Sequence, residues 1–181
     1  MSRKWGSADY KQLKALQERL QRLQSVELEK FCEACSKELA ARLLSLAIER
    51  TPIGKYPNQT GKNGGTLRRG WTARTHQEAA GGSGVPNAAQ AVQYAQNMPI
   101  NKAGNTYTIE VINPVEYASY VEFGHRQEPG RYVPAIGKRL KAGWVNGQYF
   151  LTFAEKDLER IAPGILEKKL NAFLKEAFSD L

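Results

Sequence analysis

The stretch Tyr117-Ala118-Ser119-Tyr120-Val121-Glu122-Phe123-Gly124 carries a dense row of aromatic residues, and the rest of the chain is divided around it. Before it, residues 105–113 alternate apolar and polar side chains until Asn113-Pro114, which predicts a strand. Within the stretch the apolar residues share one helical face, and glycine is the usual residue after a helix end. We therefore predict a short helix that ends at Gly124.

Long helices are predicted on both sides of this centre. Residues 26–50 carry a wide apolar stripe, and Thr51-Pro52 ends it because the residue before proline is pushed out of helical geometry. Residues 144–153 predict a strand or hairpin around Asn146-Gly147. A helix follows from residue 154, a break is expected at Pro163-Gly164, and residues 165–178 form a final amphipathic helix.

The middle of the chain is predicted as loop, strand and insertion. Residues 52–66 are rich in glycine, proline and asparagine and predict a loop. Residues 66–75 alternate in a way that favours a strand. Residues 76–104 are rich in small residues and predict a long flexible insertion, with a short helix over 88–97.

These elements favour an α+β fold in one domain spanning residues 1–181. A small antiparallel sheet would be packed by the long N-terminal helix and the C-terminal helix. Residues 1–25 predict an N-terminal helical extension whose apolar residues either pack on the body or dock on a neighbouring subunit. The residues of this stripe are Leu13, Leu16, Leu20 and Leu23.

Charge is distributed unevenly along the chain. Residues 1–75 hold 15 Lys and Arg against 7 Asp and Glu, whereas residues 76–181 hold 11 of each. Clustered cations favour a polyanion such as DNA, although a solvated basic loop is the commoner explanation of such a run. The cations of interest are Lys55, Lys62, Arg68, Arg69 and Arg74.

Few residues suggest a catalytic or metal-binding site. Cys32 and Cys35 lie on one face of the predicted helix without a second ligand pair, so we interpret them as buried small hydrophobes. His76 and His125 have no nearby catalytic partner, and we expect neither an enzyme nor a bound metal or cofactor. No apolar run reaches membrane-spanning length, and no signal peptide is expected at the start of the chain.

Two motifs in fixed order resemble a family of tailed bacteriophages. Thr51-Pro52 after a long helix, followed by Thr66-Leu67-Arg68-Arg69-Gly70-Trp71, is similar to the first half of the head–tail joining family, whose members are neck or tail-completion components. Asn113 followed by residues 117–124 is similar to its second hallmark. The resemblance runs from about Arg50 to Val133, and the chain departs from it in the insertion and at His125, where threonine is commoner.

The resemblance implies a structural virion protein without enzymatic activity. Members form rings, six- or twelve-fold, that join the DNA-filled head and its connector or stopper proteins to the tail-terminator or tail-tube proteins. The chain would be assembled in the bacterial cytoplasm and would contact itself and the passing double-stranded DNA, but no membrane. A free nucleic-acid-binding module that uses residues 50–75 is the alternative.

Particular residues receive roles from this resemblance. The five cations named above would face the channel lumen or a DNA-proximal surface. The leucine stripe and the insertion would contact adjacent subunits or partner proteins of the neck. Glu122 would pair with Arg126 or Arg131 of a neighbour, or else form a local surface ion pair of little energy. For Tyr117, Tyr120, Phe123 and Trp71 we expect core packing, with an interface role open for one or two of them.

Overall fold

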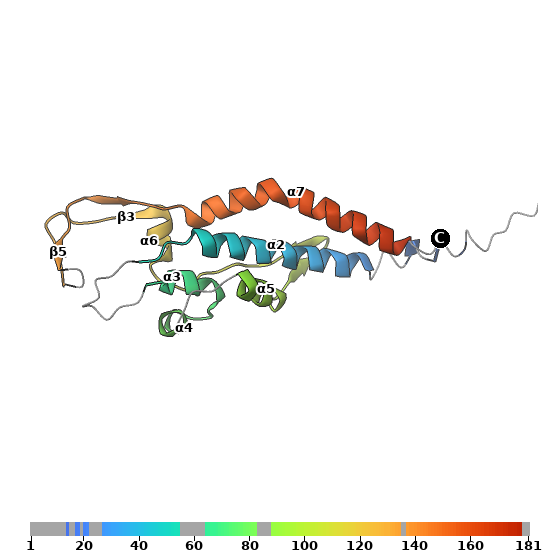
Figure 1. The fold of residues 1–181 in the computed structure, drawn as a ribbon, viewed down its shortest axis with the longest axis horizontal. Coiled ribbons are helices and arrows are strands. Elements are labelled where there is room, and N and C mark those ends of the chain that lie inside the picture. The colour runs from blue at the N-terminus through green and yellow to red at the C-terminus, as the bar shows by residue number, and fades with distance from the viewer. Residues whose placement is uncertain are drawn as a thin grey trace, which may run out of the picture.

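The computed structural model describes residues 14, 17, 18, 20, 21, 27–54, 64–82, 88–134 and 137–178. The expected α+β class is confirmed, with two long helices and several short elements (Figure 1). The helices are α2 (Leu28–Arg50), α3 (Thr66–Arg69), the 3₁₀ turn η3 (Gly70–Thr72), α4 (His76–Gly81), α5 (Ala88–Gln96), α6 (Ala118–Phe123) and α7 (Phe150–Ala177). The strands are β1 (Asn101–Ala103), β2 (Thr106–Thr108), β3 (Gly124–Arg126), β4 (Tyr132–Val133), β5 (Lys138–Arg139) and β6 (Trp144–Asn146).

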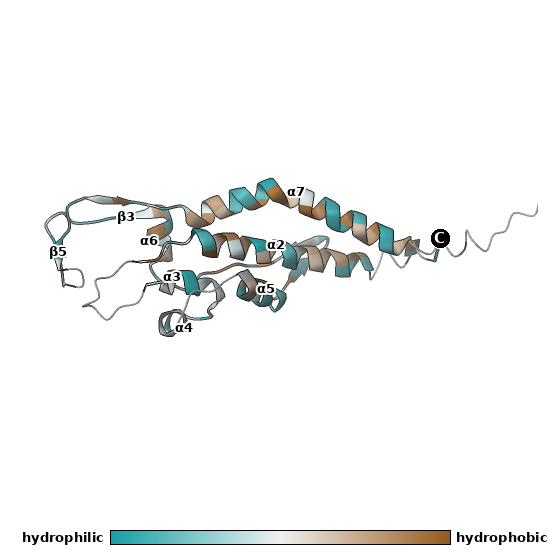
Figure 2. Ribbon diagram, viewed as in Figure 1, coloured by the Kyte–Doolittle hydropathy of each residue, from teal (hydrophilic) through white to brown (hydrophobic). Residues whose placement is uncertain are grey.

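Helix α2 is the centre of the molecule. It lies between α7 on one side and α5 with α3 and α4 on the other (Figure 1). Hydrophobic and hydrophilic segments alternate along α2 and α7 (Figure 2). Because α2 has neighbours on two sides, its apolar residues are not confined to one face. The core residues of α2 are Ala40, Ala41, Leu44, Ala47 and Ile48. The three alanines among them let neighbouring helices approach closely.

The predicted end of α2 is confirmed. The helix stops at Arg50, and Thr51 leaves helical geometry with φ −65° and ψ 126°. Thr51 is fully buried, and its hydroxyl donates to the carbonyl of Ala47 at 2.5 Å. Burial and this hydrogen bond therefore fix the residue that precedes Pro52.

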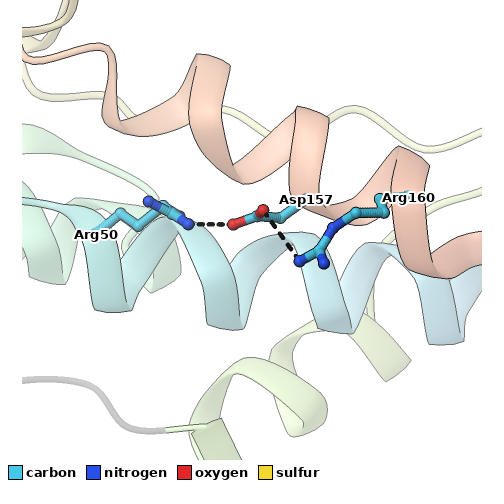
Figure 3. A network of polar contacts seen from close by, with 3 residues as sticks. All are labelled: Arg50, Asp157 and Arg160. Atoms are coloured by element: carbon cyan, nitrogen blue, oxygen red, sulfur yellow. Dashed lines mark hydrogen bonds and ion pairs between the residues drawn. The ribbon is translucent and has the colours of Figure 1, made fainter.

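Helix α7 runs antiparallel to α2 and continues through Pro163, so the predicted break at Pro163-Gly164 is wrong. Figure 1 shows a bend part-way along α7, which is the usual result of a proline inside a helix. Contacts with α2 at both ends hold the helix: Phe31 stacks on Phe173 with ring centroids 4.7 Å apart, and Arg50 pairs with Asp157 (Figure 3). Packing thus outweighs the local cost of proline.

The predicted strand over 66–75 is also wrong, because Thr66–Thr72 forms α3 and η3. Leu67 and Trp71 are buried at 4% and 2% exposure. They lie four residues apart, a spacing that places both on one face of a helical turn. The alternation that suggested a strand is compatible with this geometry as well.

The expected flexible insertion, 76–104, contributes to the body of the molecule in its described residues. It forms α4, α5 and β1. The short helix predicted at 88–97 is confirmed as α5, and Ala91 and Ala95 are fully buried against α2. The hydroxyl of Thr75 accepts from the Glu78 amide at 3.1 Å and caps α4.

In the described ranges, the strands form three separate two-stranded antiparallel ladders in place of the single covered sheet that we expected. In the segment predicted as a strand, 105–113, only Thr106–Thr108 pairs, with β1. Ile109 and Val111 still pack against the core, so the predicted apolar face is present in an unpaired segment. Of the predicted strand or hairpin over 144–153, only Trp144–Asn146 is a strand, because α7 begins at Phe150.

The ladders β3–β6 and β4–β5 lie one after the other in residues 124–146, a segment that we call the β-arm and that the structure describes at 124–134 and 137–146. Between them the amide of Gln127 donates to Gly143 at 2.9 Å, and the amide of Gly130 donates to Leu140 at 2.8 Å. Leu140 also donates to Arg131, so two consecutive residues oppose one and the arm contains a β-bulge, with Gly130 at φ +87°. The β-arm extends beyond the ends of α2 and α7 (Figure 1).

Candidate functional site

The base of the β-arm is where α6, the arm and α7 meet, and Glu122 is at its centre. Its side chain is only 4% exposed. One carboxylate oxygen accepts from the Leu151 amide at 2.9 Å, and the other accepts from the Thr152 amide at 2.9 Å and its hydroxyl at 2.7 Å. Glu122 therefore caps the first turn of α7 from outside that helix. This intramolecular role differs from the surface ion pair that we expected.

Two glycines allow the chain segments to cross at this base, which we call the junction (residues 121–124 and 145–152). Gly124 has φ +86°, and a Cβ there would lie 2.4 Å from the carbonyl oxygen of Val145. A Cβ at Gly147 would lie 2.2 Å from the carbonyl oxygen of Glu122. A side chain at either position would clash with the backbone. Gly124 is therefore required for two reasons, its positive φ angle and its small size.

Hydrogen bonds hold the first sequence motif together and join it to the second. Trp71 Nε1 donates to the hydroxyl of Thr51 at 2.7 Å, and Arg68 Nε donates to the carbonyl of Thr51 at 2.9 Å. From the second motif, Asn113 Nδ2 donates to the carbonyl of Leu67 at 2.9 Å. A Cβ at Gly70 would lie 2.1 Å from Asn113 Oδ1. These motif residues thus stabilise the fold.

The cations that sequence reasoning assigned to a DNA channel are in different situations. Arg68 and Arg69 are half-buried and bind backbone carbonyls: Arg68 those of Thr51 and Glu49, and Arg69 those of Ala79 and Gly64. Arg74 is exposed. Lys55 and Lys62 lie outside the described residues.

Of the expected interface residues, Leu20 is 43% exposed in a helical position. Leu13, Leu16 and Leu23 lie outside the described residues. Arg126 and Arg131 are exposed on the β-arm, away from the buried carboxylate of Glu122.

The core packing that we expected is confirmed for Trp71 and is wrong for Tyr117, Tyr120 and Phe123. Several aromatic side chains near the junction are exposed. We call them the junction aromatics: Tyr120, Phe123, Tyr149 and Phe153, exposed by 58%, 60%, 43% and 46%. Tyr149 stands at φ +50° and lies edge-on to Phe153. Exposed aromatic residues are candidates for contact with another protein.

The described residues hold no group of three or more potential metal ligands. Cys32 and Cys35 are free thiols, and burial raises the pKa of the Cys35 thiol, which is the behaviour of an apolar core residue. His76 and His125 lie beside Tyr117 and Tyr120, at ring distances of 6.2 and 5.7 Å. In the part of the chain that the structure describes, no helix is both long enough and apolar enough to cross a membrane.

Comparison with known families identifies the chain. The family model described as "Bacteriophage HK97-gp10, putative tail-component" matches residues 14–124. The chain belongs to this family. Searches of curated proteins and of solved structures gave no significant match.

Membership of the HK97-gp10-like family makes the chain a structural phage protein of the tail, and so a part of the virion. The matched residues contain α2 to α6 and both motifs, and they end at Gly124. The β-arm beyond Gly124 and helix α7 lie outside the match. The sequence analysis did not single out the arm, because residues 76–181 together carry no net charge.

Proposed function

We propose that this protein forms a ring in the phage neck that joins the DNA-filled head and its connector to the tail. The observation that carries the proposal is the family match over residues 14–124, which includes the motifs at Thr51 and at 117–124. A ring of this kind would contact connector or stopper proteins on one side and tail-terminator or tail-tube proteins on the other. We infer no enzymatic role.

The junction aromatics are our candidates for subunit contacts. Each of the four side chains exposes more than 40% of its surface, and removing such apolar surface from water favours association. The leucine stripe that includes Leu20 is the second candidate. We do not carry Glu122 into this proposal, because its carboxylate already binds three donors inside the subunit.

The alternative, a free nucleic-acid-binding module based on residues 50–75, loses support from the hydrogen bonds of Arg68 and Arg69. Guanidinium groups that already bind backbone carbonyls of their own subunit have fewer donors to offer a phosphate. We therefore keep the virion role as the proposed function.

The test combines assembly and solution mass. Particles produced without this protein should accumulate as unjoined heads and tails, and adding the purified chain should restore joining. Phe123→Ala with Phe153→Ala should reduce joining and ring formation, measured by light scattering after size exclusion, while Val92→Ala, an exposed apolar site on α5, should not. Normal joining in particles that lack the protein would refute the proposal.

A further inference from the structure

The β-arm concentrates positive charge. Its 23 residues, 124–146, contain five cations and a single acid, Glu128. The cations are Arg126, Arg131, Lys138, Arg139 and Lys141, all exposed. Residues 76–181 have no net charge because this basic segment lies between two segments with more acids than bases.

These cations form no ion pair in the described part of the chain. The ion pairs found there join residues of α2, α7 and β1, and none of them involves the arm. Of the five cations, all in the described part of the chain, only Arg139 makes a described side-chain hydrogen bond, to the carbonyl of Gly130 at 2.7 Å. Unpaired and exposed cations keep their full attraction for an external polyanion.

Aromatic side chains lie opposite two of the arginines. Trp144 pairs with Arg126 across β3 and β6, and Tyr132 pairs with Arg139 across β4 and β5. Trp144 and Tyr132 are 54% and 53% exposed. Each pair thus offers a charge for phosphate and an apolar surface for sugars or thymine methyl groups.

The shape of the arm narrows the choice of polyanion. A two-stranded β-ribbon is one of the two elements that the major groove of B-DNA admits. An isolated ribbon of this kind is also poorly stable in water, so a partner along its length would order it. The arm extends past the helical body, so that such a partner can reach it without contacting α2 or α7 (Figure 1).

We propose that the β-arm is the surface of this protein that contacts double-stranded DNA, through the phosphate backbone and with little preference for sequence. The choice of DNA over other polyanions rests on the proposed function, in which the ring surrounds the passing genome. The arm takes the place of residues 50–75 as the basic element that faces the DNA.

The test measures binding of a mixed-sequence duplex of about 24 base pairs by fluorescence anisotropy over a range of salt concentrations. Engagement of four or five cations gives a slope of log affinity against log salt of about −4, at about −0.9 per phosphate neutralised. The arm variant replaces Arg126, Arg131, Lys138 and Lys141 by glutamine and keeps Arg139 for its bond to Gly130. It should bind at least tenfold more weakly and lose most of the slope.

A matched control removes the same charge elsewhere. It replaces Lys30, Lys156, Lys168 and Lys175, exposed residues of α2 and α7, by glutamine. This control should keep most of the affinity, and exchange of Arg for Lys and Lys for Arg at the four arm positions should keep the slope. Trp144→Ala should weaken binding while leaving the slope unchanged.

Two results would overturn the inference: equal losses for the arm variant and the control, or binding of polyglutamate as tight as that of DNA. The second would indicate an acidic protein surface as the partner. Ring formation and head–tail joining are measured without added DNA, so the two proposals fail separately. A ring that ignores DNA refutes only the inference, and a DNA-binding monomer that particles do not need for joining refutes only the proposed function.

Discussion

Removal of the Glu122 carboxylate should destabilise the protein strongly although this residue is not in any catalytic site. Glu122→Ala leaves the amides of Leu151 and Thr152 without their acceptor at the start of α7. An unsatisfied buried donor costs about 1–3 kcal/mol, and loss of a helix cap costs about 1 kcal/mol. Because these terms overlap, we expect a total of about 3 kcal/mol of unfolding free energy.

Glu122→Gln should cost about half as much, since the amide keeps one acceptor oxygen but loses the charge that favours a helix N-terminus. Urea unfolding followed by circular dichroism gives the free energy, and a thermal melt should show a loss of about 6–12 °C for the alanine variant. Glu116→Ala is the matched control, because Glu116 is exposed just before α6. A Glu122→Ala protein within about 0.5 kcal/mol of the parent would refute the capping role.

Three further substitutions test the packing, each by urea unfolding. Trp71→Phe removes the donor to the buried Thr51 hydroxyl and should cost about 1–2 kcal/mol, and a neutral result would argue against that hydrogen bond. Gly147→Ala should cost more than about 2 kcal/mol because its Cβ would lie 2.2 Å from a carbonyl oxygen. Gly143→Ala is the control and should cost clearly less, because the nearest described neighbour of its Cβ would be 3.9 Å away. Equal losses would contradict the close crossing. Gly164→Ala should raise the unfolding free energy by about 0.5–1 kcal/mol, since it lies inside α7 with open space around its Cβ, and a loss would indicate that the bent helix needs glycine there.

The parts of the fold that sequence predicted correctly are those governed by strong local signals. Thr51-Pro52 ended α2 where expected, and Gly124 ended α6. In both cases the backbone geometry of one residue decides the boundary, so neighbouring elements have little influence. The helix at 88–97 was also predicted, and its described part is rich in alanine and glutamine, which favour helices.

The incorrect predictions concern segments whose secondary structure is determined by tertiary contacts. Leu67 and Trp71 satisfy both an alternating pattern and a helical one, and only their burial against α2 and Val115 selects the helix. Pro163 failed to break α7 because contacts with α2 on both sides of it hold the helix. The capping role of Glu122 could not be predicted, since its partners lie 29 and 30 residues away in sequence. The β-arm was missed because its charge averages out over a long window.

The close crossing at Gly124 and Gly147 makes the β-arm an exchangeable module. Both of its strands leave and re-enter the body within one ladder, where Gly124 pairs with Asn146. An arm of another length or composition can therefore be grafted between these two positions while α6, Glu122 and α7 keep their contacts. The same entry point suits a fluorescent tag or a crosslinker that reports what the arm meets inside an assembled particle.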